Sequence, residues 1–249
     1  MFRKLIMVVA ALAMMLPAEA QNMRKALKKR TAEAGVIGSV GYYGNPHWGA
    51  GANIHYLHGI GRKRQTISIG AGVRGNLFFS KDREYTTSSA VLSAMNPGGA
   101  DSMFLKEVQT NTVNAYLAVK IFVKRGVNII FTTDIGGVNF GDRKEGYFHS
   151  YETNPVPPGT RYFTEPYAFN AQIPGKESYG TIMTELYGTF RINPVLMWRL
   201  GVNHLRNEYV ADRNIPMNGK RFSQSNWMVM TGLGFDLRWQ KNARQGNLW

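Results

Sequence analysis

The sequence contains no cysteine, and this absence excludes a disulfide framework and any thiolate metal or redox site. Acidic residues are also few, with 16 Asp and Glu against 30 Lys and Arg, so the formal net charge is +14. No segment has the roughly 18 consecutive apolar residues of a transmembrane helix. A cysteine-free chain of 249 residues must therefore be stabilised by a packed core or by strands that cross a membrane.

The first twenty residues have the pattern of a secretory signal peptide. Arg3 and Lys4 form a charged start, an apolar run covers 5–16, and Ala18-Glu19-Ala20 supplies a cleavage site. The apolar run is too short to span a bilayer. We therefore expect residues 1–20 to be removed on export, and we leave them out of the fold.

Alternation of apolar and polar residues indicates long β-strands. In 225–239, SNWMVMTGLGFDLRW, residues Trp227, Val229 and Leu233 share one parity, while Asp236 and two glycines share the other. A period of two is typical of a strand. Seven further segments show strand character, and most are longer than the five or six residues usual in globular proteins. The predicted strands are 35–43, 47–58, 65–79, 108–123, 127–140, 178–192, 195–209 and 225–239.

The connections between these strands alternate between short and long. Short links occur at 59–64, 124–126 and 193–194, whereas 80–107, 141–177 and 210–224 are long. The first outer loop, 44–46, is also short, so the outer loops are mostly long. Bacterial outer-membrane barrels have short periplasmic turns and long external loops. The sequence therefore predicts an all-β chain that forms an eight-stranded antiparallel up-and-down transmembrane β-barrel. A soluble β-sandwich is the alternative, and in it the apolar side of each strand would face a core instead of lipid.

The predicted organisation has four parts. A signal peptide covers 1–20, and a short basic N-terminal segment, periplasmic and rich in helix-forming residues, covers 21–34. The β-barrel covers 35–239, and a C-terminal tail covers 240–249. The expected location is the outer membrane.

The layout resembles small outer-membrane barrels of the OmpX and OmpA membrane-domain type. The segment TTDIGGVNFG (132–141), after NTVNAYLAVKIF (111–122), looks like a pattern in uncharacterised outer-membrane barrels of the Bacteroidota. Gly234-x-x-Leu237-x-Trp239 resembles the last-strand signal that barrel assembly machinery reads, although Gly232 stands where a polar residue is usual and ten residues follow Trp239. The resemblance implies that this machinery is a partner during biogenesis.

The residues that alternate with the apolar ones would face the barrel interior, and several of them are charged. An eight-stranded barrel is only wide enough for side chains to fill, so charges of both signs should pair there. Arg74, Asp134 and Glu185 fall near the middle of their strands, and with Arg199 they form a predicted lumen charge cluster. This cluster has two interpretations, a salt-bridged plug or the gate of a narrow conducting path. The other predicted lumen residues are Asp236, Lys120, Arg191, Arg238, Asn53, His55, Asn114 and Asn203.

The long segment 141–177 combines aromatic residues with five of the ten prolines. Proline lowers the cost of ordering an exposed surface, and aromatic side chains give contact area at low entropic cost. The segment is therefore interpreted either as a surface that recognises an external ligand or protein, or as rings that pack together and cap the barrel mouth. Its aromatic residues are Tyr147, Phe148, Tyr151, Tyr162, Phe163, Tyr167 and Phe169.

Positive charge gathers at the predicted periplasmic end. Basic side chains there suit anionic phospholipid headgroups, so outer-membrane lipids are an expected partner; a solvated basic end is the alternative. Nucleic acid is not expected as a partner, because an exported chain rarely meets it. The predicted periplasmic basic rim consists of Arg24, Lys25, Lys28, Lys29, Arg30, Arg62, Lys63 and Arg64.

No complete catalytic constellation is found. Asn203-His204-Leu205-Arg206 resembles the His-x-Ser-Asn element of outer-membrane lipid-A deacylases, but Arg206 stands where the nucleophilic serine should be. The remaining histidines have no metal-ligand spacing, so no metal or cofactor is expected. The sequence favours a non-enzymatic surface or envelope protein that binds through its external loops. The alternatives are a narrow gated channel or small-solute transporter, and third, a lipid-modifying enzyme.

Overall fold

The computed structural model describes residues 30–42, 45–60, 66–88, 101–150, 155–172, 178–216 and 219–237. Across these ranges the chain is built from strands, and no helix in them is long and apolar enough to cross a membrane. The strands are β1 (Arg30–Gly41), β2 (His47–Ile60), β3 (Ile67–Thr87), β4 (Ser102–Lys124), β5 (Val127–Phe140), β6 (Lys144–His149), β7 (Thr160–Pro166), β8 (Phe169–Ala171), β9 (Ile182–Arg191), β10 (Leu196–Ile215) and β11 (Gly219–Asp236).

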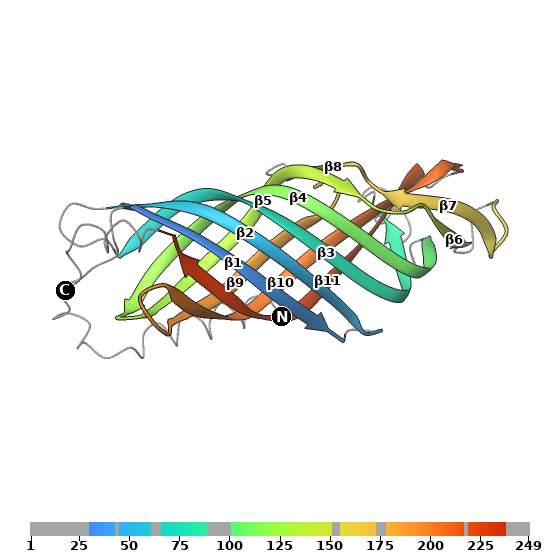
Figure 1. The fold of residues 1–249 in the computed structure, drawn as a ribbon. Coiled ribbons are helices and arrows are strands. Elements are labelled where there is room, and N and C mark those ends of the chain that lie inside the picture. The colour runs from blue at the N-terminus through green and yellow to red at the C-terminus, as the bar shows by residue number, and fades with distance from the viewer. Residues whose placement is uncertain are drawn as a thin grey trace.

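Eight of these strands close into a barrel. The hydrogen-bonded order β1–β2–β3–β4–β5–β9–β10–β11 returns to β1, and every pair in it is antiparallel. The strands run obliquely around the barrel axis (Figure 1). These strands correspond in order to the eight segments expected from alternation, so the predicted barrel is confirmed.

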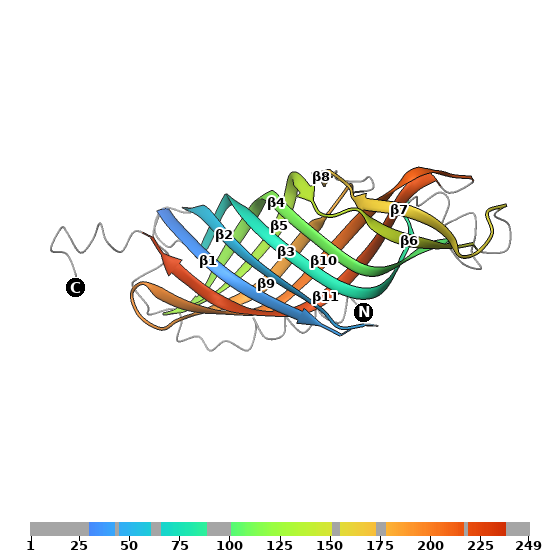
Figure 2. The same cartoon turned by 45° about the vertical axis from the view of Figure 1, so that its right-hand side comes forward.

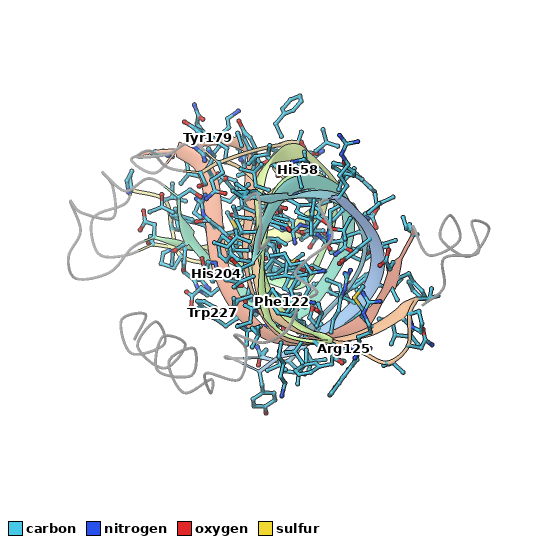
Figure 3. All side chains as sticks on the ribbon, turned by 90° about the vertical axis from the view of Figure 1, so that its left-hand side faces the viewer. His58, Phe122, Arg125, Tyr179, His204 and Trp227 are labelled. Carbon is cyan, nitrogen blue, oxygen red and sulfur yellow. The ribbon has the colours of Figure 1, made fainter. Side chains whose placement is uncertain are left out.

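The two faces of the wall have opposite character. On β11, Trp227, Val229 and Leu233 point outward and are 46%, 58% and 39% exposed. Met228 and Met230, between them, are buried inside. A view along the barrel shows side chains filling the ring (Figure 3). An apolar outer surface of this extent, on a ring with no free edge, is suited to hydrocarbon. The chain is a transmembrane β-barrel.

The long segments predicted as loops are largely strands, and this corrects the sequence-based expectation. β3 and β4 continue beyond the barrel to Thr87 and from Ser102, and β10 and β11 extend in the same direction (Figure 2). Segment 141–177 contains β6, β7 and β8. β6 pairs with β4, β7 pairs with β6 and β10, and β11 pairs with β3 through Phe222 and Ser223. A second, six-stranded ring therefore stands on the end of the barrel opposite the start of β1, and we call it the external extension.

A phase shift explains why alternation alone missed the external extension. On β3 the inward residues are even-numbered up to Ser80 and odd-numbered from Arg83 to Thr87. The change occurs at Asp82, whose φ is +50°. On β4, Lys106 and Glu107 are both exposed, and the inward parity changes there as well. The two changes face each other, because Lys81 pairs with Glu107 and Arg83 pairs with Leu105, so the register between β3 and β4 is unchanged.

Aromatic and other apolar side chains form a core inside the external extension, beside buried polar residues such as Arg83. Phe148 lies in edge-to-face contact with Tyr162 and Phe222, at ring centroid distances of 6.2 and 6.4 Å. Tyr85 meets Tyr209 at 5.3 Å, and burial raises the pKa of the Tyr209 hydroxyl to about 12. These phenols therefore stay neutral, and they pack with Met103 and Leu105 in one buried cluster. The external end of the barrel is closed by a hydrophobic core.

The start of the barrel also differs from its predicted boundary. Residues 30–34, assigned from the sequence to the basic N-terminal segment, belong to β1, where Arg30 pairs with His58. Thr31 and Glu33 are buried while Ala32 and Ala34 are only half-buried, so strand alternation already begins here. Residues 21–29 and 238–249, with the signal peptide and the tail, lie outside the described residues.

Candidate functional site

The centre of the lumen is an ion-paired triad. Arg74 on β3 donates from Nε to Asp134 Oδ1 at 2.6 Å, and its Nη1 lies 2.7 Å from Glu185 Oε2. Asp134 is on β5 and Glu185 on β9, and all three side chains are fully buried. The structure thus brings together the three residues that the sequence placed near mid-strand. One guanidinium donates to both carboxylates, and its charge-assisted hydrogen bonds hold the three side chains together.

The triad also holds the backbone where β9 begins. Met183 donates its N–H to Asp134 Oδ2 at 2.8 Å, and its carbonyl accepts from Arg74 Nη2 at 3.0 Å. Asn114 donates to Asp134 Oδ2 at 2.7 Å and to the Thr181 carbonyl at 3.1 Å. Asn170 accepts the Thr181 N–H at 2.6 Å. Polar side chains from β4, β5 and β8 therefore bind the backbone at the start of β9.

Arg199, the fourth member of the predicted cluster, is held differently. Its Nη1 donates to Asn53 Oδ1 at 2.8 Å and its Nη2 to the Ala34 carbonyl at 3.2 Å. The guanidinium carbon lies 5.4 Å from the centre of the Tyr187 ring. A Cβ built at Gly35 or Gly234, which pair across β1 and β11, would overlap this guanidinium. Both positions must be glycine for the arginine to lie flat against the wall.

A second buried cluster includes a residue that the sequence analysis assigned elsewhere. Glu33, expected near the periplasmic basic rim, faces inward and forms a close ion pair with Lys120. His55 Nε2 lies 3.4 Å from Glu33, and His55 Nδ1 lies 2.9 Å from the Tyr116 hydroxyl. The Tyr116 ring in turn lies under Arg74, 4.6 Å from its guanidinium carbon. Extending the β1 alternation back to Thr31 was the signal that could have found Glu33.

The lumen is both neutral and filled. The buried acids Glu33, Asp134 and Glu185 are matched by the buried bases Arg74, Lys120 and Arg199, and the buried Asp236 is matched by the partly exposed Arg191. Matching is required, because an unpaired charge in the interior is very costly. Between this network and the external extension lies a cavity of only about 10 Å³, lined in part by Asn76, Thr181 and Asn203. Such a space holds about one water molecule.

The other predicted lumen residues divide into two groups. Asn53, His55, Asn114, Lys120, Asn203 and Asp236 are buried as expected. Arg191 is 36% exposed, and its Nη2 lies 3.6 Å from Asp236 at the end of the barrel, so its assignment to the lumen was wrong. Arg191 follows the last inward position of β9 and turns toward solvent. Arg238 lies outside the described residues.

The aromatic residues of 141–177 are spread over several environments. Phe148 and Tyr162 are buried in the external extension, which fits the capping interpretation. Phe163 is 37% exposed and lies between Arg143 and Arg161, whose guanidinium carbons are 4.6 and 5.2 Å from its ring centre. Tyr147 lies beside Lys106, Tyr167 lies beside Arg221, and Phe169 is 68% exposed. Tyr151 lies outside the described residues.

Two predicted sites remain largely untested by the structure. Of the periplasmic basic rim, Arg30 is exposed at the start of β1, whereas Arg24, Lys25, Lys28, Lys29, Arg62, Lys63 and Arg64 lie outside the described residues. His204, in the element that resembles a deacylase motif, contacts Trp227 on the outer wall, with ring centroids 4.8 Å apart and the ring planes tilted by 50° (Figure 3). Within the described part of the chain, no group of three His, Asp or Glu residues is arranged to hold a metal ion.

Comparison with known proteins gives likenesses among solved structures only. No protein-family model matches the chain, and no curated protein matches it. Neisserial surface protein A is 7% identical with a TM-score of 0.35, over 84% of this chain and 98% of that one. A major outer membrane protein from Thermus thermophilus is 11% identical with a TM-score of 0.33, over 82% and 98%. The attachment invasion locus protein Ail of Yersinia pestis is 12% identical with a TM-score of 0.29, over 83% and 97%. The assignment of this chain as a membrane barrel rests on its own ring closure and apolar outer face.

We predict that Arg74→Ala destabilises the barrel by roughly 3–5 kcal/mol, because it leaves two buried carboxylates without their cation. Guanidinium unfolding of the full chain in lipid vesicles measures the loss. Arg143→Ala is the matched control, since its pair with Asp212 is exposed and contributes at most about 1 kcal/mol. The neutral triple variant Arg74→Met, Asp134→Asn, Glu185→Gln should recover most of the loss. Equal effects of Arg74→Ala and Arg143→Ala would contradict the buried triad.

We predict that Gly35→Ala costs roughly 1–3 kcal/mol, as overpacking of an interior does, because the new methyl group overlaps Arg199. Gly38→Ala on the same strand is the control, since a Cβ there meets nothing within 4 Å. The same unfolding measurement compares the two variants. Adding Arg199→Met to Gly35→Ala should relieve the strain, and a purely additive double variant would show that the two residues do not touch.

Proposed function

We propose that this chain is an outer-membrane β-barrel with a non-enzymatic surface role, and that it binds a partner through its external extension. The observation that carries the proposal is the pair of barriers along the barrel axis. An ion-pair network fills the lumen, and a hydrophobic core closes the external ring. A molecule filled along its axis in this way acts through its surfaces.

The exposed face of β6, β7 and β10 is the surface that fits a partner best. Phe163 lies between two arginines, and both arginines form exposed ion pairs, Arg143 with Asp212 and Arg161 with Glu145. Exposed pairs of this kind contribute little, so a ligand carboxylate, sulfate or phosphate can replace the protein carboxylates. Arginine and aromatic residues are enriched in the buried centres of interfaces. We infer a partner that carries acidic groups.

The two alternatives have less support. A gated channel needs the Arg74 triad to separate, and this would leave three charges unpaired. The hydrophobic core of the external extension would still close the path. A lipid-modifying enzyme needs a nucleophile beside His204, where Arg206 is directed to the Ser178 carbonyl and Glu208 is paired with Arg221. Outer-membrane lipids and, during biogenesis, the barrel assembly machinery are the further proposed partners.

The test is binding of the full chain in nanodiscs to an array of acidic glycans and acidic peptides. We expect binding that falls at least about tenfold in Phe163→Ala/Arg143→Gln/Arg161→Gln, since two cations and an aromatic anchor are removed. Phe169→Ala is the control, because it removes an exposed ring from the barrel wall instead of the external extension.

Planar bilayer recordings with the same preparation separate the channel alternative. We expect no stepwise current from the native chain, with or without Arg74→Ala. Stepwise currents that Arg74→Ala alters, together with array binding that the triple variant leaves unchanged, would contradict the proposed surface role and favour transport.

A further inference from the structure

A groove of about 400 Å³ lies at the base of the external extension. It forms where β4 changes its neighbour from β5 to β6, so that the ring narrows from eight strands to six. The narrowing leaves a shoulder at the upper end of the lipid-facing wall. We call this space the shoulder groove, and its main lining residues are Pro46, Trp48, Phe79, Lys81, Glu107 and Lys144.

The lower half of the shoulder groove is aromatic and continuous with the lipid-facing wall. Trp48 on β2 and Phe79 on β3 are paired in register, and their rings stack with centroids 4.4 Å apart and planes at 22°. Trp48 is 51% exposed, and Leu77, the next outward residue below Phe79, is 45% exposed. Aromatic residues at this level are typical of the interface between hydrocarbon and headgroups. The lower half can therefore receive the start of an acyl chain.

The upper half of the shoulder groove carries two lysines. Lys81 is exposed two residues above Phe79 on the same face of β3, and among the described residues no carboxylate forms an ion pair with it. Lys144 on β6 reaches the groove from the other side, with its Nζ 3.9 Å from Glu107 and 3.8 Å from Asp142. These distances exceed those of charge-assisted hydrogen bonds, and both carboxylates are largely exposed. A phosphate placed between the two lysines can therefore displace these carboxylates from Lys144.

We propose that the shoulder groove binds a phosphorylated lipid of the outer leaflet. The phosphate lies between Lys81 and Lys144, and the acyl chain runs down past Trp48 and Phe79. The arrangement of the groove along the barrel axis favours a lipid over free phosphate, because the lysines lie next to an aromatic surface that faces hydrocarbon. The site is separate from the acidic-partner surface around Phe163, because Phe163, Arg143 and Arg161 do not line the groove.

The probe is diphosphorylated lipid A, titrated into the full-length protein in a neutral detergent and followed by native mass spectrometry. We expect Lys81→Gln/Lys144→Gln to weaken binding at least about fivefold, since each lysine near an anionic lipid contributes about that factor. Lys124→Gln/Lys220→Gln is the matched control, because it removes the same charge at sites outside the groove and should leave binding within about twofold. Trp48→Ala should also weaken binding, and lipid A without its phosphates should bind at least about fivefold more weakly than the diphosphorylated form.

Three results would overturn the proposal. Equal weakening by the two double variants would mean that net charge alone attracts the lipid. Equal binding of lipid A with and without phosphates would mean that the lysines do not bind the phosphates of the headgroup. Full competition by inorganic phosphate at matched concentration, with no effect of Trp48→Ala, would mean a free-anion site. Heat-dependent gel mobility of each variant, boiled against unboiled, shows that the barrel is folded in every arm.

Discussion

The burial of charge inside a ring that lipid surrounds is the constraint on which the rest of the structure depends. The outer face of the wall must be apolar, so the polar half of every strand turns inward, where little water can reach it. Arg74, Asp134 and Glu185 satisfy one another at 2.6 and 2.7 Å, and the remaining hydrogen-bonding atoms of the triad bind the backbone at the start of β9. The buried triad therefore contributes to the stability of the barrel, to the register of its strands and to the closure of its lumen.

The external extension reverses this arrangement within the same strands. Below Asp82, β3 turns Leu77 outward and Arg74 inward; above it, Tyr85 is inward and Glu84 is outward. On β3 and on β4 the residues that face the interior change between even-numbered and odd-numbered positions. The change occurs at the level where the surroundings change from lipid to water. Ion pairs occupy the barrel interior and an aromatic cluster occupies the extension interior, and the shoulder between them combines an aromatic surface with lysines.

Much of the barrel was predictable because its alternation is long and uninterrupted. In the predicted strand 225–239, alternate residues from Trp227 indicated the lipid face, and mid-strand position was enough to group Arg74 with its two carboxylates. The external extension was missed because Asp82 and the Lys106–Glu107 pair break the period, and prolines between β6 and β7 suggested a loop. The contact of Arg199 with Gly35 and Gly234 depends on the stagger between three strands, which no single segment encodes. Glu33 was misplaced because basic neighbours concealed the start of β1.

Accessibility along β11 tests the central claim most directly, and the lack of native cysteine makes single-cysteine labelling simple. Spin labels at Met228, Val229, Met230 and Thr231, in the full chain reconstituted in bilayers, are compared for relaxation by membrane-dissolved oxygen and by a water-soluble nickel complex. The structure predicts high oxygen accessibility at 229 and 231 and protection from both reagents at 228 and 230. High nickel accessibility at 229 and 231, or the opposite alternation, would contradict a lipid-facing apolar wall around a filled lumen.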